Sequence, residues 1–384
     1  MRLLVTGGSG FLGRELVPRL LKAGHQVYGL SRHGPDLVGD ITQYNLGLKH
    51  VPRLDGVVHL AALMSFKDED REASLRINSV GTCEVCEFCT RHSIPYLFHV
   101  STAYVCGDAT GLWSERDYRR RQRFKNPYEE SKFLAEGHVR EEAASRPWKA
   151  HPLKAVIFRP SIIVGRASDG MATSFEGFYY PLKAVAACQE FAERRLHLPR
   201  RQDAERRLHL PQLPLDIRIH GDPDGTLNLV PVDWVAQTMA HLINEEPSRP
   251  VRVYHLTNPV PPTNEAIIKV VGEALGLARI GFSPTARHDP LSDLYNRLIR
   301  PFSPYLWGEP AFISSVGANF PKLDLGLIIG FWRKANAGRP REKARSATSE
   351  ADDGCCGRPD REAAGPDAGQ TGEAFPERDD RQAL

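Results

Sequence analysis

Three glycines at every third position stand between an apolar strand and a helix at the start of the chain, in the segment VTGGSGFLG. Residues 2–6 form the apolar run before them, and the helical segment FLGRELVPRLLKAG follows, with its leucines on one face. Gly7 suits a tight turn, Gly10 lets the backbone approach a pyrophosphate, and Gly13 lets the helix pack closely on a sheet. The helix N-terminus then faces the phosphates. The spacing predicts a dinucleotide-binding turn, with a plain tight turn as the alternative.

Four further apolar segments, HQVYGLS, GVVHLAA, PYLFHVST and KAVIFRPSIIVG, alternate with helical segments. This alternation predicts an α/β fold, a doubly wound parallel sheet of the Rossmann type. The rhythm breaks after Gly165, which indicates a smaller, partly helical substrate lobe. The expected division is a dinucleotide-binding domain at 1–165 with about 227–258 returning to it, and a lobe at 166–226 and 259–333.

Two later segments differ from a folded core. Residues 334–384 hold almost no large apolar side chains, so we expect a disordered tail. The unit at 192–203 recurs at 204–215, and this period is far below that of repeat architectures. We expect a tolerated surface duplication there, with a patch that binds an acidic ligand as the alternative.

Composition limits the class of protein. The 384 residues are 41% hydrophobic and 25% charged, with a net charge of +3, which fits a globular protein without nucleic acid as its main partner. We find no signal peptide and no run of about 20 apolar residues, so we expect a cytoplasmic protein without stable membrane insertion. Seven cysteines suggest free thiols. Cys83, Cys86 and Cys89 fit buried helix residues better than a metal site, and we expect no metal.

The end of the second predicted strand, YGLSRHG, indicates which dinucleotide is preferred. An acid there would bind the ribose 2′-hydroxyl of NAD, but this strand ends in Ser31 and Arg32. An arginine pairs well with the 2′-phosphate of NADP, so we expect NADP (NADPH) as the cofactor. A solvated arginine is the alternative. Asp40 falls where the adenine amino group could be read.

A tyrosine and a lysine stand four residues apart in NPYEESKFLAE, after the strand end STAYVCG. On a helix, Tyr128 and Lys132 share one face. The ammonium group favours phenolate, so we expect a lowered Tyr128 pKa and a usable proton donor near neutral pH. Thr102 can hydrogen-bond a substrate carbonyl.

The motifs VTGGSGFLG, HLAA, NSVGT, STAYVCG, YEESK and RPSIIVG together resemble the extended short-chain dehydrogenase/reductases, from residue 2 to about 258. The resemblance implies a catalytic triad of Thr102, Tyr128 and Lys132, with Ser101 as a neighbouring hydroxyl. It also implies that Asn78 supports the lysine through water and that Lys132 holds the nicotinamide ribose. The expected cofactor-binding residues are Gly7, Gly10, Phe11, Leu12, Gly13, Ser31, Arg32, Asp40, Ile41, Ala61, Ala62, Lys132 and Pro160.

Within that family, STAYV, YEESKFLAE, RPSIIVGRASDG and LVPVDWVA resemble the male-sterility-type branch, the fatty acyl-CoA reductases and thioester reductase domains. This implies an NADPH-dependent oxidoreductase of lipid metabolism that reduces an acyl thioester, on coenzyme A or a carrier, to an aldehyde or alcohol. The partner would be a small acyl or lipid-like molecule, and a homodimer is left open. One alternative is an extended dehydrogenase or epimerase acting on a sugar nucleotide, sterol or other ketone. Another is a non-catalytic NADP-sensing protein.

The aromatic stretch SFEGFYYPLKAVAACQEFA has two interpretations. Phe175, Phe178, Tyr179 and Tyr180 could line a pocket for an acyl chain or form the core of the lobe. One helix face could pack inward while the other faces the nicotinamide, so the two interpretations are compatible.

Overall fold

The computed structural model describes residues 1–145, 152–195, 215–245, 247, 249–277, 279–283 and 289–336. Most of the expected tail and nearly all of the duplicated segment lie outside these residues.

Within the described residues, seven parallel strands form the main sheet, in the order β11-β7-β5-β4-β1-β2-β3. Their bounds are β1 (Arg2–Thr6), β2 (Gln26–Ser31), β3 (Leu37–Val38), β4 (Gly56–His59), β5 (Tyr96–Val100), β7 (Lys154–Pro160) and β11 (Val251–Leu256). The order reverses at β1, as in a doubly wound Rossmann sheet, and this confirms the predicted fold class. Ligands bind such sheets at the carboxyl ends of the strands beside the reversal.

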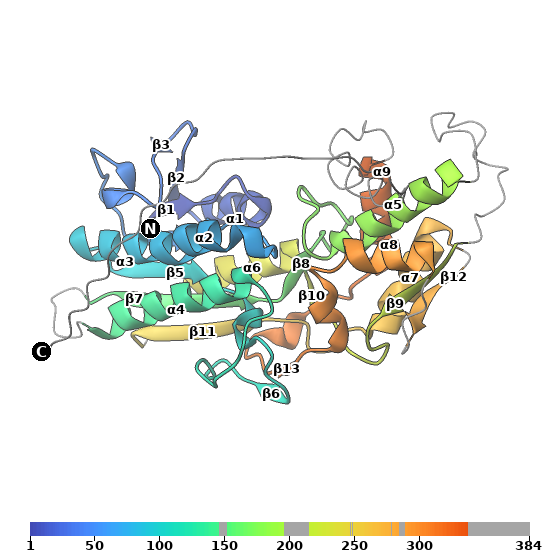
Figure 1. Ribbon diagram of the computed structural model, residues 1–384. Helices are drawn as coiled ribbons and strands as arrows, with labels where there is room; N and C mark the ends of the chain where they lie inside the picture. Colours follow the sequence, from blue (N-terminus) through green and yellow to red (C-terminus); the bar gives the residue numbers. More distant parts are fainter. Residues whose placement is uncertain are drawn as a thin grey trace, which may run out of the picture. The chain divides into compact units, whose positions relative to one another are not determined.

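Helices cover both faces of this sheet (Figure 1). They are α1 (Phe11–Lys22) and α6 (Val232–Ile243) on one face, and α3 (Gly81–Arg91) and α4 (Pro127–Ser145) on the other. Alternate residues of β1 point to opposite faces: Leu3 and Val5 pack against α1 and α6, while Leu4 packs with the core under α3 and α4. The sheet is therefore buried on both sides, which explains its nearly continuous apolar strands.

The expected strand at 154–165 is two strands. β7 ends at Pro160, and β8 (Ile162–Val164) pairs in parallel with β10 (Leu229–Pro231), outside the main sheet. Proline has no N–H to donate, so the ladder stops there. Ser161 then donates its backbone N–H to the Leu256 carbonyl (3.2 Å) and its hydroxyl to Asn228 Oδ1 (2.7 Å). The first bond joins Ser161 to the end of β11, and the second joins it to the residue that precedes β10.

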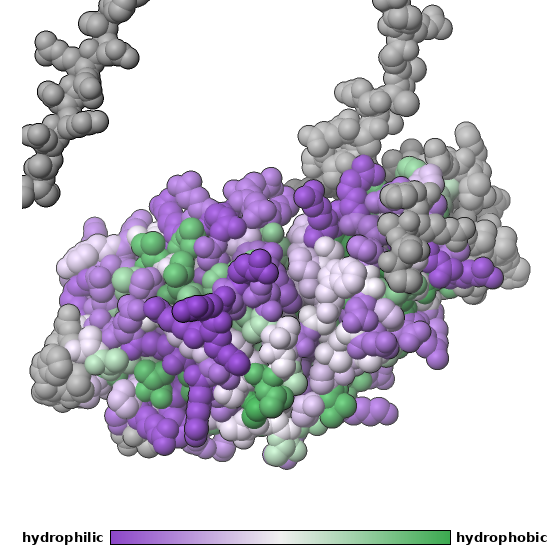
Figure 2. Space-filling view, turned by 60° about the horizontal axis from the view of Figure 1, so that its bottom comes forward, coloured by the Kyte–Doolittle hydropathy of each residue, from purple (hydrophilic) through white to green (hydrophobic). Residues whose placement is uncertain are grey.

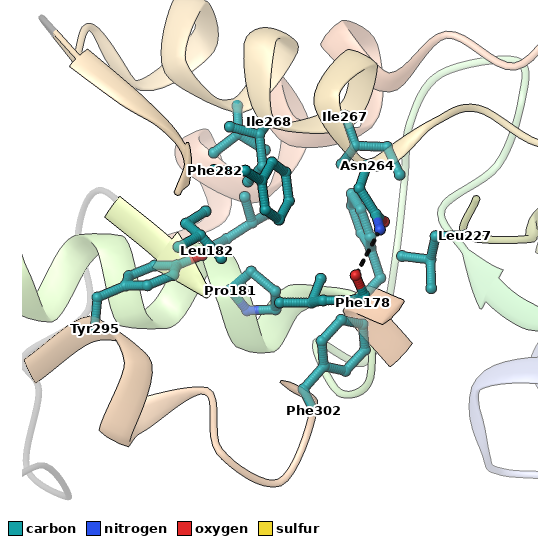
Figure 3. A pocket seen from close by; sticks show the side chains of 13 residues that line it. Phe178, Pro181, Leu182, Leu227, Asn264, Ile267, Ile268, Phe282, Tyr295 and Phe302 are labelled. Carbon is teal, nitrogen blue, oxygen red and sulfur yellow. Dashed lines mark hydrogen bonds between the residues drawn. The ribbon is translucent and has the colours of Figure 1, made fainter. Parts of the chain in front are cut away.

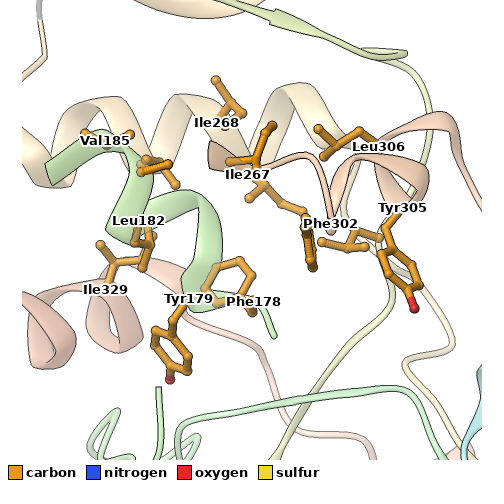
Figure 4. Packing of buried hydrophobic residues seen from close by; sticks show 14 of the residues in the cluster. Phe178, Tyr179, Leu182, Val185, Ile267, Ile268, Phe302, Tyr305, Leu306 and Ile329 are labelled. Carbon is orange, nitrogen blue, oxygen red and sulfur yellow. The ribbon is translucent and has the colours of Figure 1, made fainter. Parts of the chain in front are cut away.

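A second lobe is built around one apolar core (Figure 4). Its elements are α5 (Tyr179–Arg195), β9 (Asp216–His220), α7 (Asn264–Leu275), β12 (Arg279–Ser283), α8 (Pro290–Leu298), η6 (Ser303–Trp307) and α9 (Leu325–Asn336). Thr263 caps α7, because its hydroxyl accepts the Ala266 N–H (3.2 Å). Helix α9 continues to Asn336 and so includes residues 334–336, which were expected to belong to the tail.

Short elements connect the larger ones. They are η1 (Tyr44–Gly47), η2 (Asp68–Asp70), α2 (Arg71–Ser74), η3 (Leu75–Val80), η4 (Ala103–Cys106), β6 (Leu112–Trp113), β13 (Ala311–Phe312) and η7 (Gly317–Asn319). In the part of the chain that is described, no helix is both long and apolar enough to cross a bilayer. Figure 2 shows hydrophobic residues in separate small patches on a mainly hydrophilic face.

The cysteines of α3 take the structural positions expected for them. Cys86 and Cys89 are buried in the core between the helix and the sheet, while Cys83 is half-buried. Burial raises the pKa of both buried thiols, which makes them poor nucleophiles and weak metal ligands.

Candidate active site

The glycine turn between β1 and α1 has no room for side chains. Gly7 has a φ of +70°, which favours glycine, and its carbonyl accepts the Gly10 N–H (3.0 Å). A Cβ on Gly7 would lie 2.6 Å from the Ala61 nitrogen, and one on Gly13 would lie 2.5 Å from the Gly7 oxygen. Helix α1 begins at Phe11, directly after the turn. The turn, the helix N-terminus and the end of β4 thus meet in a compact backbone cradle.

A buried hydrogen-bond chain that the sequence analysis missed fixes this cradle. The Ala61 N–H donates to Thr6 Oγ1 (3.2 Å), and the Thr6 hydroxyl donates to His59 Nδ1 (2.7 Å). On the other side, His59 Nε2 donates to Thr82 Oγ1 (3.0 Å), because the Thr82 proton is bonded to the Asn78 carbonyl (2.5 Å). Burial, then the charge of Lys132, lowers the pKa of His59 to about 3, so the imidazole is neutral. In the sequence, the histidine of HLAA was the one sign of this hydrogen-bond chain.

Asn78 sits in the π-helical turn η3 and is fully buried. Its side-chain oxygen accepts the Leu63 N–H (2.7 Å), and its amide nitrogen donates to the Leu63 carbonyl (2.8 Å) and to Ser131 Oγ (2.9 Å). The amide therefore ties the segment after β4 to α4, one residue before Lys132. π-Turns recur at functional sites. The expected support of Lys132 through water stays a prediction.

Tyr128 and Lys132 lie one turn apart on α4, at the carboxyl end of the sheet. Burial lowers the pKa of Lys132 to about 7. Burial, then the neighbouring Glu129 charge, raises the pKa of Tyr128 to about 12. The expected lowering of the Tyr128 pKa is therefore wrong, since burial and the Glu129 charge both disfavour the phenolate. At neutral pH the phenol keeps its proton, which is the form that a proton donor needs.

Thr102 follows β5 and is buried. Its hydroxyl oxygen accepts the Tyr104 N–H (3.2 Å) and lies 3.4 Å from the Pro160 carbonyl oxygen, to which it can donate. The ends of β5 and β7 thus bring Thr102 and Pro160 together, as expected if both residues belong to one site.

A buried ion pair between β7 and α4 was also missed. Arg159 and Glu136 are fully buried and joined by two hydrogen bonds (2.6 and 3.0 Å). Ser101 and Arg140 donate to the same carboxylate (2.8 Å each). Burial alone would raise the pKa of Glu136, but Arg159 and these other donors hold it at about 2. Its charge also favours the protonated form of Lys132. The signal was an acid one turn after the lysine in YEESKFLAE.

The residues expected to select the cofactor lie at the end of β2 and the turn after β3. Arg32 is exposed, and Asp40 Oδ1 accepts both the N–H and the hydroxyl of Thr42 (2.8 Å each). These bonds, and more weakly the charges of Arg32 and Arg76, lower the pKa of Asp40. The exposed Asp36 accepts the Gly29 N–H (3.0 Å) through its carboxylate. Other expected positions differ in burial: Leu12 and Ile41 are buried, Phe11, Ser31 and Ala61 are half-buried, and Ala62 is exposed.

Two of the four residues singled out in the aromatic stretch lie in the core of the lobe, and a pocket for an acyl chain stays a prediction. Phe178 and Tyr179 are buried in the lobe core (Figure 4). Tyr180 instead stacks on Phe66, with ring centroids 6.3 Å apart, and Phe66 lies 6.3 Å from the Tyr128 ring. Aromatic rings from the sheet domain and the lobe therefore meet beside Tyr128.

A separate cavity lies inside the lobe (Figure 3). Apolar side chains such as Phe178, Leu182 and Phe302 line it, and Asn264 donates across it to the Leu306 carbonyl (3.0 Å). Its volume of about 20 Å³ holds roughly one water or methyl group. Neither Tyr128 nor Lys132 lines it, so it is a packing defect of the lobe core and not the reaction site.

Curated relatives match part of the chain. A 2-alkyl-3-oxoalkanoate reductase of Stenotrophomonas maltophilia is 34% identical over 155 residues, covering 36% of this chain and 46% of that protein. A 3β-hydroxysteroid dehydrogenase/isomerase of Mycobacterium tuberculosis is 31% identical over 155 residues, covering 36% and 42%. Fatty acyl-CoA reductase 8 of Arabidopsis thaliana is 36% identical over 99 residues, covering 23% and 19%. The chain thus spans half or less of the length of each of these relatives.

Solved structures share the fold at low identity. The terminal R domain of the myxalamid PKS-NRPS pathway gives a TM-score of 0.63 at 21% identity, covering 87% of this chain and 90% of that one. A UDP-glucose 4-epimerase of Bifidobacterium longum gives 0.58 at 17%, covering 88% and 99%. The family model described as male sterility protein matches residues 35–239, more than half of the chain. The curated relatives above are reductases and a dehydrogenase/isomerase by their printed names, which agrees with the predicted enzyme class, an oxidoreductase. The chain therefore belongs to the male sterility protein family of NAD(P)-binding domains, within the extended short-chain dehydrogenase/reductases.

Proposed function

We propose that this protein is an NADPH-dependent reductase that transfers a hydride to the carbonyl carbon of an acyl thioester, giving an aldehyde or an alcohol. The observation that carries the substrate class is the aromatic surrounding of Tyr128. Phe66, Tyr180 and Tyr305 come from segments far apart in the sequence and converge beside the proton donor. Such a surface suits an apolar chain next to the reacting carbonyl better than a sugar.

The residues at the carboxyl end of the sheet fit a dinucleotide. The cradle that a Cβ on Gly7 or Gly13 would fill leaves backbone N–H groups and the start of α1 for a pyrophosphate. Lys132 is buried, and its ammonium has no hydrogen-bond partner among the described side chains and backbone. It would therefore bind the hydroxyls of the nicotinamide ribose. Arg32, exposed at the end of β2, would pair with the 2′-phosphate.

In the mechanism, bound NADPH would supply the hydride. Thr102 would donate a hydrogen bond to the substrate carbonyl and hold it beside the Tyr128 hydroxyl. Tyr128 would give its proton to the oxygen as the C–H bond forms, which converts the thioester to a hemithioacetal. Cleavage of the carbon–sulfur bond then releases aldehyde and thiol. Lys132, when protonated, would stabilise the phenolate left on Tyr128.

Acyl-CoA thioesters of increasing chain length test this function. We expect NADPH-dependent formation of aldehyde or alcohol, with KM falling as the chain grows, because each buried methylene contributes about 0.8 kcal/mol. Steady-state kinetics with even-numbered chains would show the trend, and KM should level off once the pocket is full. Absence of turnover with every thioester would remove this substrate class but leave the fold and the cofactor site intact.

A ketone is the second candidate substrate. It is favoured by the 34% identity to the Stenotrophomonas reductase, whose printed name specifies a 3-oxoalkanoate substrate. The same residues could act on a ketone, and the product would be a secondary alcohol with no thiol released. Thiol detection with a chromogenic disulfide reagent therefore separates the two reactions in one assay.

Replacing Arg32 with alanine should erase most of the preference for NADPH over NADH. Charge-assisted hydrogen bonds contribute about 1.5–3 kcal/mol, so the ratio of the two Kd values should fall by roughly tenfold to a hundredfold. Fluorescence titration of each cofactor measures it. The control is Arg252→Ala on β11, at the opposite edge of the sheet, which should leave the ratio unchanged. Equal NADPH and NADH affinities in the unmodified protein would contradict the assignment.

A further inference from the structure

Side chains close the first turn of the helix that carries the proposed proton donor. Asn126 Oδ1 accepts the Glu129 N–H (3.0 Å), and Glu129 Oε2 reaches back to accept the Lys125 N–H (2.9 Å). This reciprocal pattern resembles a capping box, which satisfies backbone donors that a helix start leaves without partners. Tyr128 lies between the two capping residues, so the cap holds the backbone on which its side chain depends.

The substrate lobe completes this cap. Tyr305 of η6 accepts a hydrogen bond from Asn126 Nδ2 (2.8 Å) and donates its own proton to Glu129 Oε1 (2.7 Å). All three side chains are buried, at 3%, 5% and 0% exposure respectively. Figure 4 shows the Tyr305 ring at the edge of the lobe core, with its hydroxyl pointing away from α5 and α7. One phenol of the lobe thus joins both capping side chains of α4.

The Tyr305 ring adds a second connection to the proton donor. Its centroid lies 5.7 Å from that of Phe66, and Phe66 lies 6.3 Å from Tyr128. The Lys125 ammonium is 4.9 Å from the Tyr305 ring centroid, within range of a cation–π interaction. The ring is therefore held from two sides, and the hydroxyl has one fixed position.

We propose that Tyr305 is a positioning residue for the reaction. Its hydroxyl holds the first turn of α4, and the Tyr128 ring with it, in the geometry needed for proton transfer. The folded lobe thereby sets the orientation of the proton donor as well as the walls of the substrate site. This inference rests on the proposed function only in taking Tyr128 as the proton donor.

The pH dependence of activity, which follows the charge of Glu129, is a readout that a loss of stability alone would not change. The charged or titratable groups that face it are Lys125, Tyr305, Tyr128, Cys106 and Asp108. Burial raises the pKa of Glu129 to about 7, although Lys125 and the Tyr305 hydroxyl act to lower it. Removal of that hydroxyl raises it further. Because the ionised carboxylate is the better acceptor, activity should fall as the pH drops through this pKa, at a higher pH in the variant.

Tyr305→Phe tests the proposal, since it keeps the ring and removes the hydroxyl. We expect amide hydrogen exchange in the first turn of α4 to become about tenfold faster, as for a lost cap. We also expect kcat to fall by roughly tenfold to a hundredfold, with KM and NADPH affinity nearly unchanged. The acid limb of the kcat profile should move to higher pH. In a Glu129→Gln background this movement should be absent, because no carboxyl remains to titrate.

The matched control is Tyr104→Phe. Tyr104 is equally buried, its ring lies 5.1 Å from Tyr305, and its hydroxyl also donates to a carboxyl group, that of Glu309 (2.7 Å). It should lower the melting temperature by a similar amount and leave exchange at the start of α4 at the wild-type rate.

Three results would overturn the proposal: unchanged α4 exchange in Tyr305→Phe, equal acceleration by the control, or a pH shift that persists with Glu129→Gln. The exchange measurement needs no substrate. An unmodified protein inactive on every thioester, with exchange altered by Tyr305→Phe alone, would reject the proposed function and support the positioning role.

Discussion

Tyr128→Phe is expected to lower kcat by about 100- to 10,000-fold, the usual contribution of a positioned general acid. The substitution removes the hydroxyl and leaves the ring, so contact with Phe66 and the start of α4 should persist. The cofactor Kd should stay within about twofold, because neither the glycine turn nor Lys132 changes. Single-turnover absorbance at the nicotinamide band measures the loss of hydride transfer, and NADPH titration measures the cofactor Kd.

Tyr118→Phe is the matched control for this experiment. The Tyr118 hydroxyl donates to the carbonyl of Phe133, which lies on α4 (2.6 Å). Tyr118 itself belongs to no expected site. Loss of that one hydrogen bond should cost about 1 kcal/mol of stability and leave kcat near the wild-type value. Normal turnover by Tyr128→Phe would show that another group supplies the proton.

Glu136→Gln is expected to reduce the free energy of unfolding by about 3–5 kcal/mol, because it leaves the buried Arg159 without a counter-charge. The two side chains are fully buried, so water cannot replace the lost carboxylate. Chemical denaturation followed by circular dichroism measures the change. Glu141→Gln on the same helix is the control, since its partner Arg119 and its own side chain are about 70% exposed (68% and 71%). It should change stability by less than about 1 kcal/mol.

The pH dependence of stability gives an independent test of the same pair. The pKa of Glu136 is held at about 2, below the ordinary value of roughly 4.3. A carboxyl with a depressed pKa stabilises the fold fully above its ordinary pKa, and this contribution is lost as the pH falls toward 2. The unmodified protein should therefore lose more stability between about pH 4 and 2 than Glu136→Gln does. Parallel curves for the two proteins would mean that the pair is not ionised in the fold.

The features that depend on residues close together in the chain could be predicted from the sequence. Gly7 and Gly13 stand where a side chain would meet backbone at 2.5–2.6 Å, and that demand appears in the sequence as glycine. The alternation of apolar strands and helices gave the doubly wound sheet, because one face of each element must be buried. The four-residue spacing of Tyr128 and Lys132 placed them on one helix face. The expected strand at 154–165 ends instead at Pro160, which has no N–H to donate. The residues after it pair with a different strand, β10.

Only the tertiary structure decided how these residues behave together. The pKa of Tyr128 moves up rather than down, because desolvation depends on everything packed around the ring and not on the lysine one turn away. The Asn78 amide is hydrogen-bonded to Leu63 and Ser131. The cap of α4 is completed by Tyr305, which is 179 residues from Asn126 along the chain. Hydrogen bonds of this range leave no periodic signal in the sequence. They form because the folded sheet and lobe bring buried polar groups together, where each must find a partner.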